Sequence, residues 1–266
     1  MNLRNHNFEH MLRSKLQDLE LSDKFHFFNE TTSTNDIAKK MIADNFAHET
    51  IIVTKSQTKG RGTFGRSFFS KQGTGIYMSF IIDTHKWHFK RPDLATIFTA
   101  VAVSEAIIKV TKKSPRIKWV NDLFLNHLKI GGILTETMHD SHMLVIGIGL
   151  NVSTEKEDFP ETLQGVAGSL EIDDETDEIK ALLITEIARK MLFSSRLSDF
   201  KESLSLYRLR SFILGRIVEV KIGNNLFEGY VLDINDRGQL VVKKESNEIM
   251  VLSSGDASIK GTISYA

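Results

Sequence analysis

The spacing of hydrophobic positions changes once along the chain, near residue 213. Before that point, apolar residues either recur every three to four positions, which predicts helices, or form short continuous runs, which predict buried strands. After it, short stretches of alternating apolar and polar residues are separated by turn-forming residues such as Gly223 and Gly238. The pattern predicts a mixed helix-and-strand domain over residues 1–212 and a small β-barrel over residues 213–266.

Within these two parts the periodicity predicts individual elements. Helices are expected over 1–22, from Ile37 onward, and over 93–112, about 176–198 and 204–210. Strands of the first part are expected over 25–28, 49–54, 75–82, 117–120, 123–125, 129–136 and 143–151. The strands of the barrel are expected over 216–222, 226–233, 239–243 and 249–252. The acidic run at 171–178 precedes a helix, where acids complement the helix dipole, so it does not by itself predict a metal site.

A basic, glycine-rich stretch, Lys55–Lys71, follows the second predicted strand. Its glycines, Gly60, Gly62 and Gly65, allow the backbone to approach a ligand closely. Arg61 and Arg66 can each offer paired donors to phosphate oxygens, and aromatic residues such as Phe68 supply apolar cover. Loops of this length are usually functional or disordered. We expect this loop to close over a phosphate-bearing small molecule; an ordinary exposed hairpin loop is the structural alternative.

The three glycines have the G-x-G-x-x-G spacing of dinucleotide-binding proteins. That fingerprint requires a helix directly afterwards, whose N-terminus holds the pyrophosphate. Here the glycines are followed by Arg-Ser-Phe-Phe-Ser, two more glycines and a strand, so a Rossmann domain is not favoured. A Walker loop is excluded because no G-K-[ST] occurs.

Two further polar clusters stand where predicted elements begin or end. Thr31–Asn35 suits a helix cap, and it also suits the polar head of a ligand. Trp119, Asn121 and Asp122 lie at the end of a strand. Asn121 could read an adenine edge and Asp122 could hold Mg²⁺ through water, although Asn and Asp at a turn need no ligand to explain them. Trp119 is equally compatible with plain core.

Lys129 precedes two glycines, Gly131 and Gly132, in a predicted strand. A lone lysine is usually solvated. The glycines, however, allow a ligand to lie close to this strand, where the ammonium could stabilise charge that builds in a transition state.

Composition narrows the classes of function. The chain has 266 residues, 41% hydrophobic and 26% charged, which suffices for a large core. Its net charge is zero, so it lacks the global basic field of a nucleic-acid-binding protein. It has no cysteine, which excludes disulfides and cysteine nucleophiles. Because no signal-peptide pattern or membrane-length apolar run is visible, we expect a cytoplasmic protein with no membrane or nucleic-acid partner.

Taken in order, the polar motifs resemble those of the biotin protein ligases, or biotin–carboxyl-carrier-protein ligases. Ser33–Asn35 resembles that family's S-T-N, and Gln57–Gly62 with Gly65 and Arg66 resembles its Q-x-x-G-R-G-x-x-G-R loop. Further matches are Lys118–Asp122 to K-W-P-N-D, Lys129–Glu136 to K-[IL]-x-G-I-L-x-E, Gly147–Val152 to G-I-G-[IL]-N-[VL], and Leu214, Gly215 and Val218 to the entry of a C-terminal SH3-like barrel.

The resemblance implies a two-step reaction. ATP and Mg²⁺ convert biotin to biotinyl-5′-adenylate, and a lysine of a biotin carboxyl carrier protein then takes the biotin. It implies an α/β (α+β) catalytic domain with a mixed sheet, similar to class II aminoacyl-tRNA synthetases, plus the barrel. Lys129 and Arg61 would be catalytic. The implied biotin and adenylate site comprises Ser33, Thr34, Asn35, Gln57, Gly60, Arg61, Gly62, Thr63, Arg66, Phe68, Trp119, Asn121, Lys129, Gly131 and Gly132, with Asp122 as the Mg²⁺ ligand.

Three positions depart from the family pattern: Thr63 stands where many members have a basic residue, Phe68 where tryptophan is common, and Val120 where proline is usual. The ligase pattern begins near Phe25, which predicts a monofunctional form without the DNA-binding domain of some members. The oligomeric state is left open, a homodimer included.

Two other functions stay open from the sequence. A lipoate ligase of the same superfamily would carry an R-x-[ST]-G-G-G-type segment, which is missing. A non-catalytic carrier-binding or nucleotide-sensing module would show no biotin-dependent pyrophosphate exchange.

Overall fold

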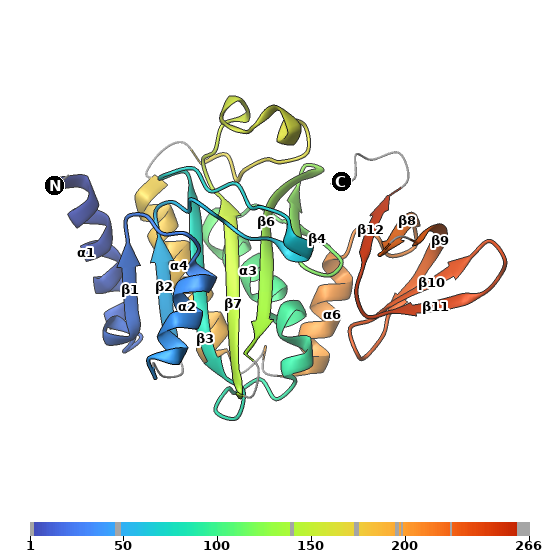
Figure 1. Ribbon diagram of the computed structural model, residues 1–266, viewed down its shortest axis with the longest axis horizontal. Coiled ribbons are helices and arrows are strands. Elements are labelled where there is room, and N and C mark those ends of the chain that lie inside the picture. Colours follow the sequence, from blue (N-terminus) through green and yellow to red (C-terminus); the bar gives the residue numbers. More distant parts are fainter. Residues whose placement is uncertain are drawn as a thin grey trace.

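Two separate sheets organise the chain, a seven-stranded mixed sheet followed by a five-stranded antiparallel one (Figure 1). The computed structural model describes residues 3–45, 49–138, 141–172, 176–194, 197, 199–223 and 225–259. The strands of the first sheet are β1 (Phe25–Phe28), β2 (Thr50–Thr54), β3 (Gly75–Asp83), β4 (Arg116–Lys118), β5 (Asp122–Leu125), β6 (Leu128–Thr137) and β7 (Met143–Asn151). Those of the second are β8 (Ile217–Ile222), β9 (Asn225–Ile234), β10 (Leu240–Lys244), β11 (Ile249–Leu252) and β12 (Asp256–Ile259).

The first sheet has the order β1-β2-β3-β7-β6-β5-β4. Only the β1–β2 pair is parallel among the strands described, and the remaining neighbours are antiparallel. β3 and β7 are paired over their whole length, from Gly75 opposite Asn151 to Asp83 opposite Met143. This long central pair gives the sheet a rigid middle against which a site can be built.

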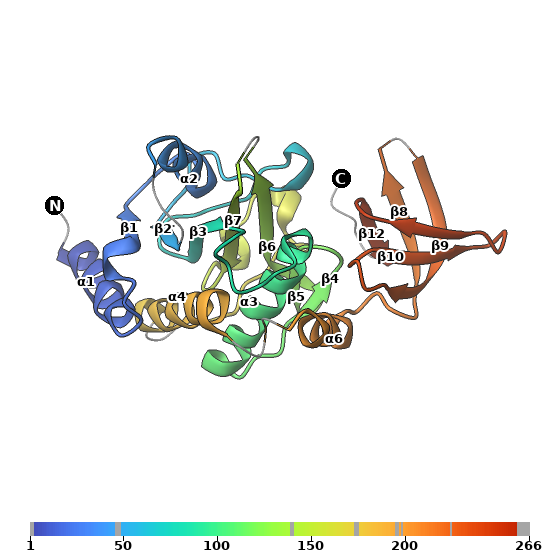
Figure 2. The same ribbon diagram turned by 90° about the horizontal axis from the view of Figure 1, so that it is seen from below.

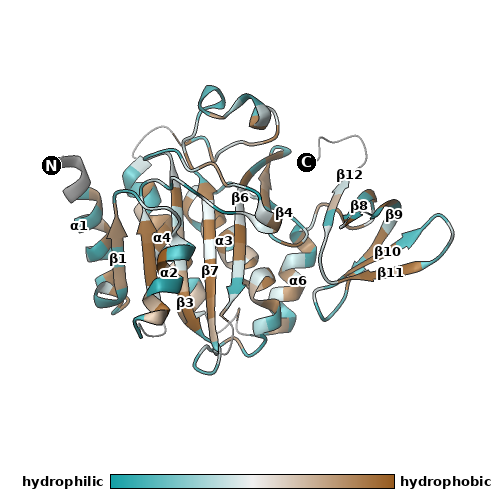
Figure 3. Cartoon of the chain, viewed as in Figure 1, coloured by the Kyte–Doolittle hydropathy of each residue, from teal (hydrophilic) through white to brown (hydrophobic). Residues whose placement is uncertain are grey.

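The helices cover the two faces of the first sheet unequally. They are α1 (Leu3–Gln17), α2 (Thr34–Ala43), α3 (Ala95–Thr111), α4 (Thr176–Phe193) and α6 (Phe200–Arg210). Figure 2 shows α2 on one face and the other helices on the opposite face. The main core lies between the helices α3 and α4 and the strands β3 and β7. Figure 3 shows the hydrophobic runs of β3 and β7. Under α2 the described residues form a smaller buried apolar cluster, Ala38, Ile52, Ile81 and Val145, which leaves room on that face for a polar site.

Contrary to the expectation from the sequence that no apolar run reaches membrane length, the segment Pro92–Thr111, which contains α3, is long and apolar enough to cross a membrane. Most of its apolar stretch is nevertheless buried, against α4, α6 and β6. Eleven residues of α3, including Phe98, Val101 and Ile107, are buried. A helix that is hydrophobic on all sides is expected in the centre of a large core as well as in a membrane, and α3 has the first role here.

The second sheet has the order β11-β10-β9-β8-β12. Four of its strands lie where alternation predicts them, whereas β12 was not predicted. This strand, Asp256–Ile259, is only four residues long, and its buried residues Ala257 and Ser258 are small rather than β-branched or aromatic, so the sequence gives a weak strand signal. Other predicted limits also shift: β4 ends at Lys118 and Asp122 already belongs to β5. α4 ends at Phe193, and the remainder of its predicted range includes residues 195, 196 and 198, which lie outside the described residues.

Side chains at the end of β4 join the first sheet to the second. The indole Nε1 of Trp119 donates to the carbonyl of Gly238 in the β9–β10 turn, at 2.9 Å. Lys118 Nζ lies 2.7 Å from Asp256 Oδ1 and 2.9 Å from Ser258 Oγ, both on β12. Gly238 has a left-handed φ of 71°, and a Cβ there would meet Ile97 of α3 at 2.4 Å. The turn therefore needs glycine to fit against the first domain.

Candidate active site

A cavity lies on the α2 face of the first sheet, between the N-terminus of α2, the loop 55–71 and strands β6 and β7. In Figure 1 this loop runs across the sheet in front of β3, β7 and β6. The residues that line the cavity and that the sequence also predicted are Ser33, Thr34, Asn35, Gln57, Arg61, Gly62, Thr63, Arg66, Phe68, Asn121, Lys129 and Gly132. Three segments far apart in the sequence, the start of α2, the loop and the region 121–132, thus meet at one cavity.

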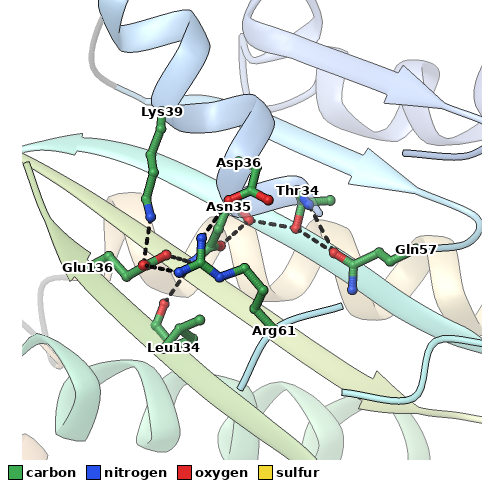
Figure 4. A network of polar contacts seen from close by, with 9 residues as sticks. Thr34, Asn35, Asp36, Lys39, Gln57, Arg61, Leu134 and Glu136 are labelled. Carbon is green, nitrogen blue, oxygen red and sulfur yellow. Dashed lines mark hydrogen bonds and ion pairs between the residues drawn. The ribbon is translucent and has the colours of Figure 1, made fainter. Parts of the chain in front are cut away.

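A chain of hydrogen bonds fixes the polar residues at the start of α2 (Figure 4). Gln57 Oε1 accepts from the backbone N–H of Thr34 at 2.9 Å, which satisfies one of the free N–H groups at the helix start. Gln57 Nε2 in turn donates to Ser70 Oγ at 2.9 Å. Ser79 of β3 lies 2.7 Å from Thr34 Oγ1 and 2.6 Å from Asn35 Oδ1. Since these groups are buried or half-buried and bonded to one another, their orientation is set before any ligand binds.

An ion-pair network continues this chain toward β6. Asn35 Nδ2 donates to Glu136 Oε2 at 2.8 Å, and Lys39 Nζ lies 2.6 Å from Glu136 Oε1. Arg61 reaches in from the loop and contacts Asp36 at 2.6 Å and Glu136 at 3.2 Å. Burial alone would raise the pKa of Glu136, but the bonds from Lys39 and Asn35 and the charges of Lys39 and Arg61 outweigh it and lower that pKa. Glu136 therefore remains a carboxylate at neutral pH.

Glycines in β7 create the space for two of these side chains. A Cβ on Gly147 would lie 2.2 Å from Asn35 Oδ1, and a Cβ on Gly149 would lie 2.5 Å from the ring of Phe68. Both distances are far below van der Waals contact, so any larger residue would displace Asn35 or the loop. Two alternating glycines in a buried strand were visible in the sequence, and this was the available signal that β7 forms a wall of the site.

The tip of the loop is a 3₁₀ turn, Thr63–Gly65, in which Phe64 and Gly65 both have left-handed φ angles of 56° and 77°. Phe64 is 70% exposed. Arg66 lies just behind the tip: its guanidinium donates to Thr63 Oγ1 at 3.2 Å and to Asp256 Oδ2 of β12 at 3.1 Å. The loop thus contacts α2 through Arg61 and the second sheet through Arg66.

Lys129 and Asn121 form the β5–β6 side of the cavity. Lys129 Nζ lies 2.8 Å from Asp122 Oδ1, and both side chains are largely buried. Asn121 Nδ2 donates to the carbonyl of Ile133 at 3.1 Å, while the Asn121 carbonyl accepts from the Ile133 N–H at 2.9 Å. Lys129 thus presents a positioned cation to the cavity, and Asp122 is engaged with that cation.

Four of the predicted site residues do not line the cavity. Trp119 is buried against the second sheet through its bond to Gly238. Gly60 and Gly131 make room for neighbouring backbone, since a Cβ would lie 2.3 Å from the Phe68 carbonyl and 2.7 Å from the Gly149 carbonyl respectively. Asp122 is paired with Lys129 and does not itself line the cavity. Within the part of the chain that the structure describes, no group of three or more His, Asp or Glu residues could hold a metal ion.

The sequence did not predict about half of the lining. These residues are Ser67, Ile133, Leu134, Gly147, Ile148, Gly149, Asn151, Phe159, Leu163 and Ala167. Phe69 also lines the cavity and is one of the loop aromatics expected as apolar cover. Phe159, Leu163 and Ala167 come from an irregular segment after β7 whose apolar residues follow no period, and we see no signal that would have identified them.

Comparison with known proteins shows to which family the chain belongs. The family model described as "Biotin/lipoate A/B protein ligase family" matches residues 27–151, and "Biotin protein ligase C terminal domain" matches residues 213–260. The bifunctional ligase/repressor of Bacillus subtilis is 32% identical over 225 residues, which is 82% of this chain and 68% of that protein. The chain belongs to the biotin protein ligase family. The ligase has the fold class expected from its sequence, a mixed α/β domain followed by a small SH3-like sheet.

Other relatives support the same placement. The biotin–[acetyl-CoA-carboxylase] ligase of Mycobacterium tuberculosis is 24% identical over 232 residues, 85% of each chain. Among solved structures, the biotin protein ligase of Aquifex aeolicus in complex with biotin and ATP aligns with a TM-score of 0.70 and 27% identity, covering 89% of this chain and 98% of that one.

Proposed function

We propose that this ligase activates biotin with ATP and transfers it to a lysine of a biotin carboxyl carrier protein. The observation that carries the proposal is the meeting of Arg61, Arg66 and Lys129 with the polar start of α2 in one cavity. Cations from the loop and from β6 suit a reaction in which a carboxylate must approach a polyphosphate. The match to a biotin-specific C-terminal domain favours biotin over lipoate as the acid.

In the first step a carboxylate oxygen of biotin attacks the α-phosphorus of ATP. The bond from that phosphorus to the bridging oxygen breaks, and pyrophosphate leaves with the electron pair. Lys129 stabilises the charge that builds on the α-phosphate oxygens, and Asp122 holds the lysine in place. Arg61 is paired with Asp36 and Glu136 in the ligand-free structure, and its remaining N–H donors, or those released when it leaves one carboxylate, would contact a phosphate.

In the second step the neutral amine of the carrier lysine attacks the acyl carbon of the adenylate. The carbon–oxygen bond to phosphate breaks, AMP leaves, and the amine loses a proton as the amide forms. The loop 55–71 shields the adenylate from water, with Phe68 against Gly149 as part of the cover. Asn121 faces the adenine, and Ser33, Thr34, Asn35 and Gln57 bind the polar part of biotin.

Mg²⁺, when bound, would neutralise phosphate charge. Asp122 is the one predicted carboxylate ligand and is paired with Lys129, so the donor set fits an ion held mainly by ATP phosphates and water. We further propose a domain boundary at residue 213 and a cytoplasmic location, where carboxylases and ATP are available.

Two measurements test the proposal. We expect biotin-dependent exchange of labelled pyrophosphate into ATP, and transfer of labelled biotin to a carrier domain but not to its Lys→Arg variant. Exchange driven by lipoate instead of biotin would contradict the choice of acid, and binding without exchange would support a sensing module.

A further inference from the structure

Glu136, near the end of β6, contacts three groups from two other segments. Its carboxylate accepts from Asn35 and Lys39 of α2 and from Arg61 of the loop, at 2.8, 2.6 and 3.2 Å. We propose that Glu136 is a positioning residue that fixes the amide of Asn35 for biotin and holds the loop through Arg61. The inference rests on the proposed function for the ligand of Asn35, but the contacts themselves do not. Figure 4 shows the carboxylate between these partners.

The first part of the argument concerns the orientation of the Asn35 amide. Its nitrogen has two hydrogens, and two acceptors stand on that side: Glu136 Oε2 at 2.8 Å and the Leu134 carbonyl at 3.3 Å. Its oxygen faces the other way, toward Ser79 Oγ and over Gly147. A hydrogen bond to a carboxylate is about twice as strong as a neutral one. Glu136 is therefore the main group that makes Asn35 present its oxygen, an acceptor, on the Gly147 side.

The opposite amide orientation would otherwise be accessible. A serine hydroxyl both donates and accepts, so Ser79 can bond to either end of a carboxamide. Ser79 also lies 2.7 Å from Thr34 Oγ1, to which it could donate instead. Without the carboxylate, the amide would be held mainly by the longer bond to Leu134. A ligand N–H that needs an acceptor at Asn35 would then meet a mixture of orientations.

The second part concerns the loop. Glu136 Oε1 is shared by Lys39 and Arg61, whereas Asp36 contacts Arg61. Lys39 and Glu136 belong to packed elements, α2 and β6, and are 27% and 19% exposed. Arg61 comes from the loop and is 44% exposed. When Arg61 turns toward a phosphate, Lys39 continues to neutralise Glu136, so the carboxylate can keep holding Asn35 while the loop rearranges.

Two isosteric variants separate these two tasks. Glu136→Gln weakens the hold on both Asn35 and Arg61, while Asp36→Asn weakens only the hold on Arg61. Trypsin cleavage between Lys59 and Arg66 in the ligand-free protein reports on the loop, and calorimetric titration with biotin alone reports on Asn35. We expect both variants to be cleaved several-fold faster than the wild type. Biotin affinity should fall about tenfold in Glu136→Gln and less than about threefold in Asp36→Asn.

The kinetic signature distinguishes positioning from general stabilisation. In pyrophosphate exchange, Glu136→Gln should raise KM for biotin with a smaller change in kcat, because saturating biotin restores the correct amide orientation. The side-chain amide resonances of Asn35 should also shift in Glu136→Gln and stay in place in Asp36→Asn. Equal losses of biotin affinity in the two variants, or unchanged affinity in Glu136→Gln, would overturn the proposal.

The outcomes also separate this proposal from the proposed function. If the wild-type ligase binds no biotin, the proposed function fails, while cleavage rates and the Asn35 resonances still test the contacts of Glu136. If Glu136→Gln does not fold, the double variant Lys39→Met with Glu136→Gln removes both charges and avoids an unpaired lysine. The same predictions apply to it.

Discussion

At the scale of single residues, the site is built from polar groups that are already bonded to one another. Gln57, Thr34, Ser79 and Asn35 form one continuous chain, and Glu136 extends it to the loop. A site whose dipoles are fixed in advance loses little free energy in reorganisation when charge develops. We therefore expect substitution of any of these hydrogen-bonded residues to weaken binding and catalysis more than the small change in side-chain volume would suggest.

Lys129→Ala tests the cation assigned to the transition state. Loss of one such group typically costs about 10²–10³-fold in rate, so biotin-dependent pyrophosphate exchange should fall by that factor. The variant also leaves Asp122 without its cation, so a lower Tm is expected; Lys129→Ala with Asp122→Asn should recover Tm but not exchange. Near-normal exchange in a folded single variant would refute the assigned role of Lys129.

At the scale of elements, the loop 55–71 packs closely against β7 through Phe68. The ring of Phe68 lies where a side chain of residue 149 would be, and the Phe68 N–H donates to the Gly60 carbonyl at 2.9 Å. Gly149 belongs to the long β3–β7 pair. If a larger residue replaced Gly149, we therefore expect β7 to stay in place and the loop to move. The loop is therefore the part of the site that sequence changes in β7 would alter first.

Gly149→Ala tests this fit. The added methyl group should push Phe68 outward, accelerate tryptic cleavage of the loop and shorten the lifetime of the bound adenylate, with little change in Tm. The expected effect is steric. Adding Gly149→Ala to a Phe68→Ala variant, where the space is already free, should therefore change the cleavage rate and the adenylate lifetime little further. Additive effects of the two substitutions would show that Gly149 acts in another way.

Elements with a strong period could be predicted from the sequence, and contacts between distant elements could not. The central strands β3 and β7 were predicted almost to the residue, because long apolar runs with flanking turns identify them. Trp119 was assigned to the site through its neighbour Asn121. Its partner, Gly238, lies in a different domain, and nothing local in the sequence reveals that bond. Glu136 was seen as part of a motif, but its role depends on α2 and the loop meeting at β6.

At the scale of the whole molecule, the second sheet is joined to the site through one carboxylate. Asp256 of β12 contacts both Lys118, which is 5% exposed, and Arg66 of the loop. Burial alone would raise the pKa of Asp256, but Lys118 and Arg66 outweigh it and lower that pKa. A change in the packing of the second sheet would therefore reach the loop through Arg66, which we propose contacts phosphate.

Asp256→Asn should lower stability in a pH-dependent way. Because the pKa of the carboxylate is depressed in the folded state, its stabilisation is present above its unfolded pKa of about 4 and is lost as pH falls through the folded value. We expect a lower Tm at pH 7 and a free energy of unfolding that is smaller by about 2 kcal/mol, as for hydrogen bonds to charged groups. The difference between variant and wild type should shrink toward pH 3. KM for ATP should rise as well.

Ser258→Ala is the matched control for this experiment. It removes one hydrogen bond from Lys118 without removing a charge. Its effect on Tm should be smaller and constant across the same pH range. A constant difference for Asp256→Asn would mean that the ion pair does not contribute as the geometry indicates.

The burial of α3 has a consequence for the order in which the ligase is synthesised. This membrane-like helix is complete when the ribosome reaches residue 111, but β6, α4 and α6, which cover it, follow only by residue 210. At about 5–20 residues per second, that interval is on the order of 5–20 s. During this time the nascent chain exposes an apolar helix that is buried in the folded enzyme. Chaperones that bind apolar segments could therefore bind α3 during translation but not after folding.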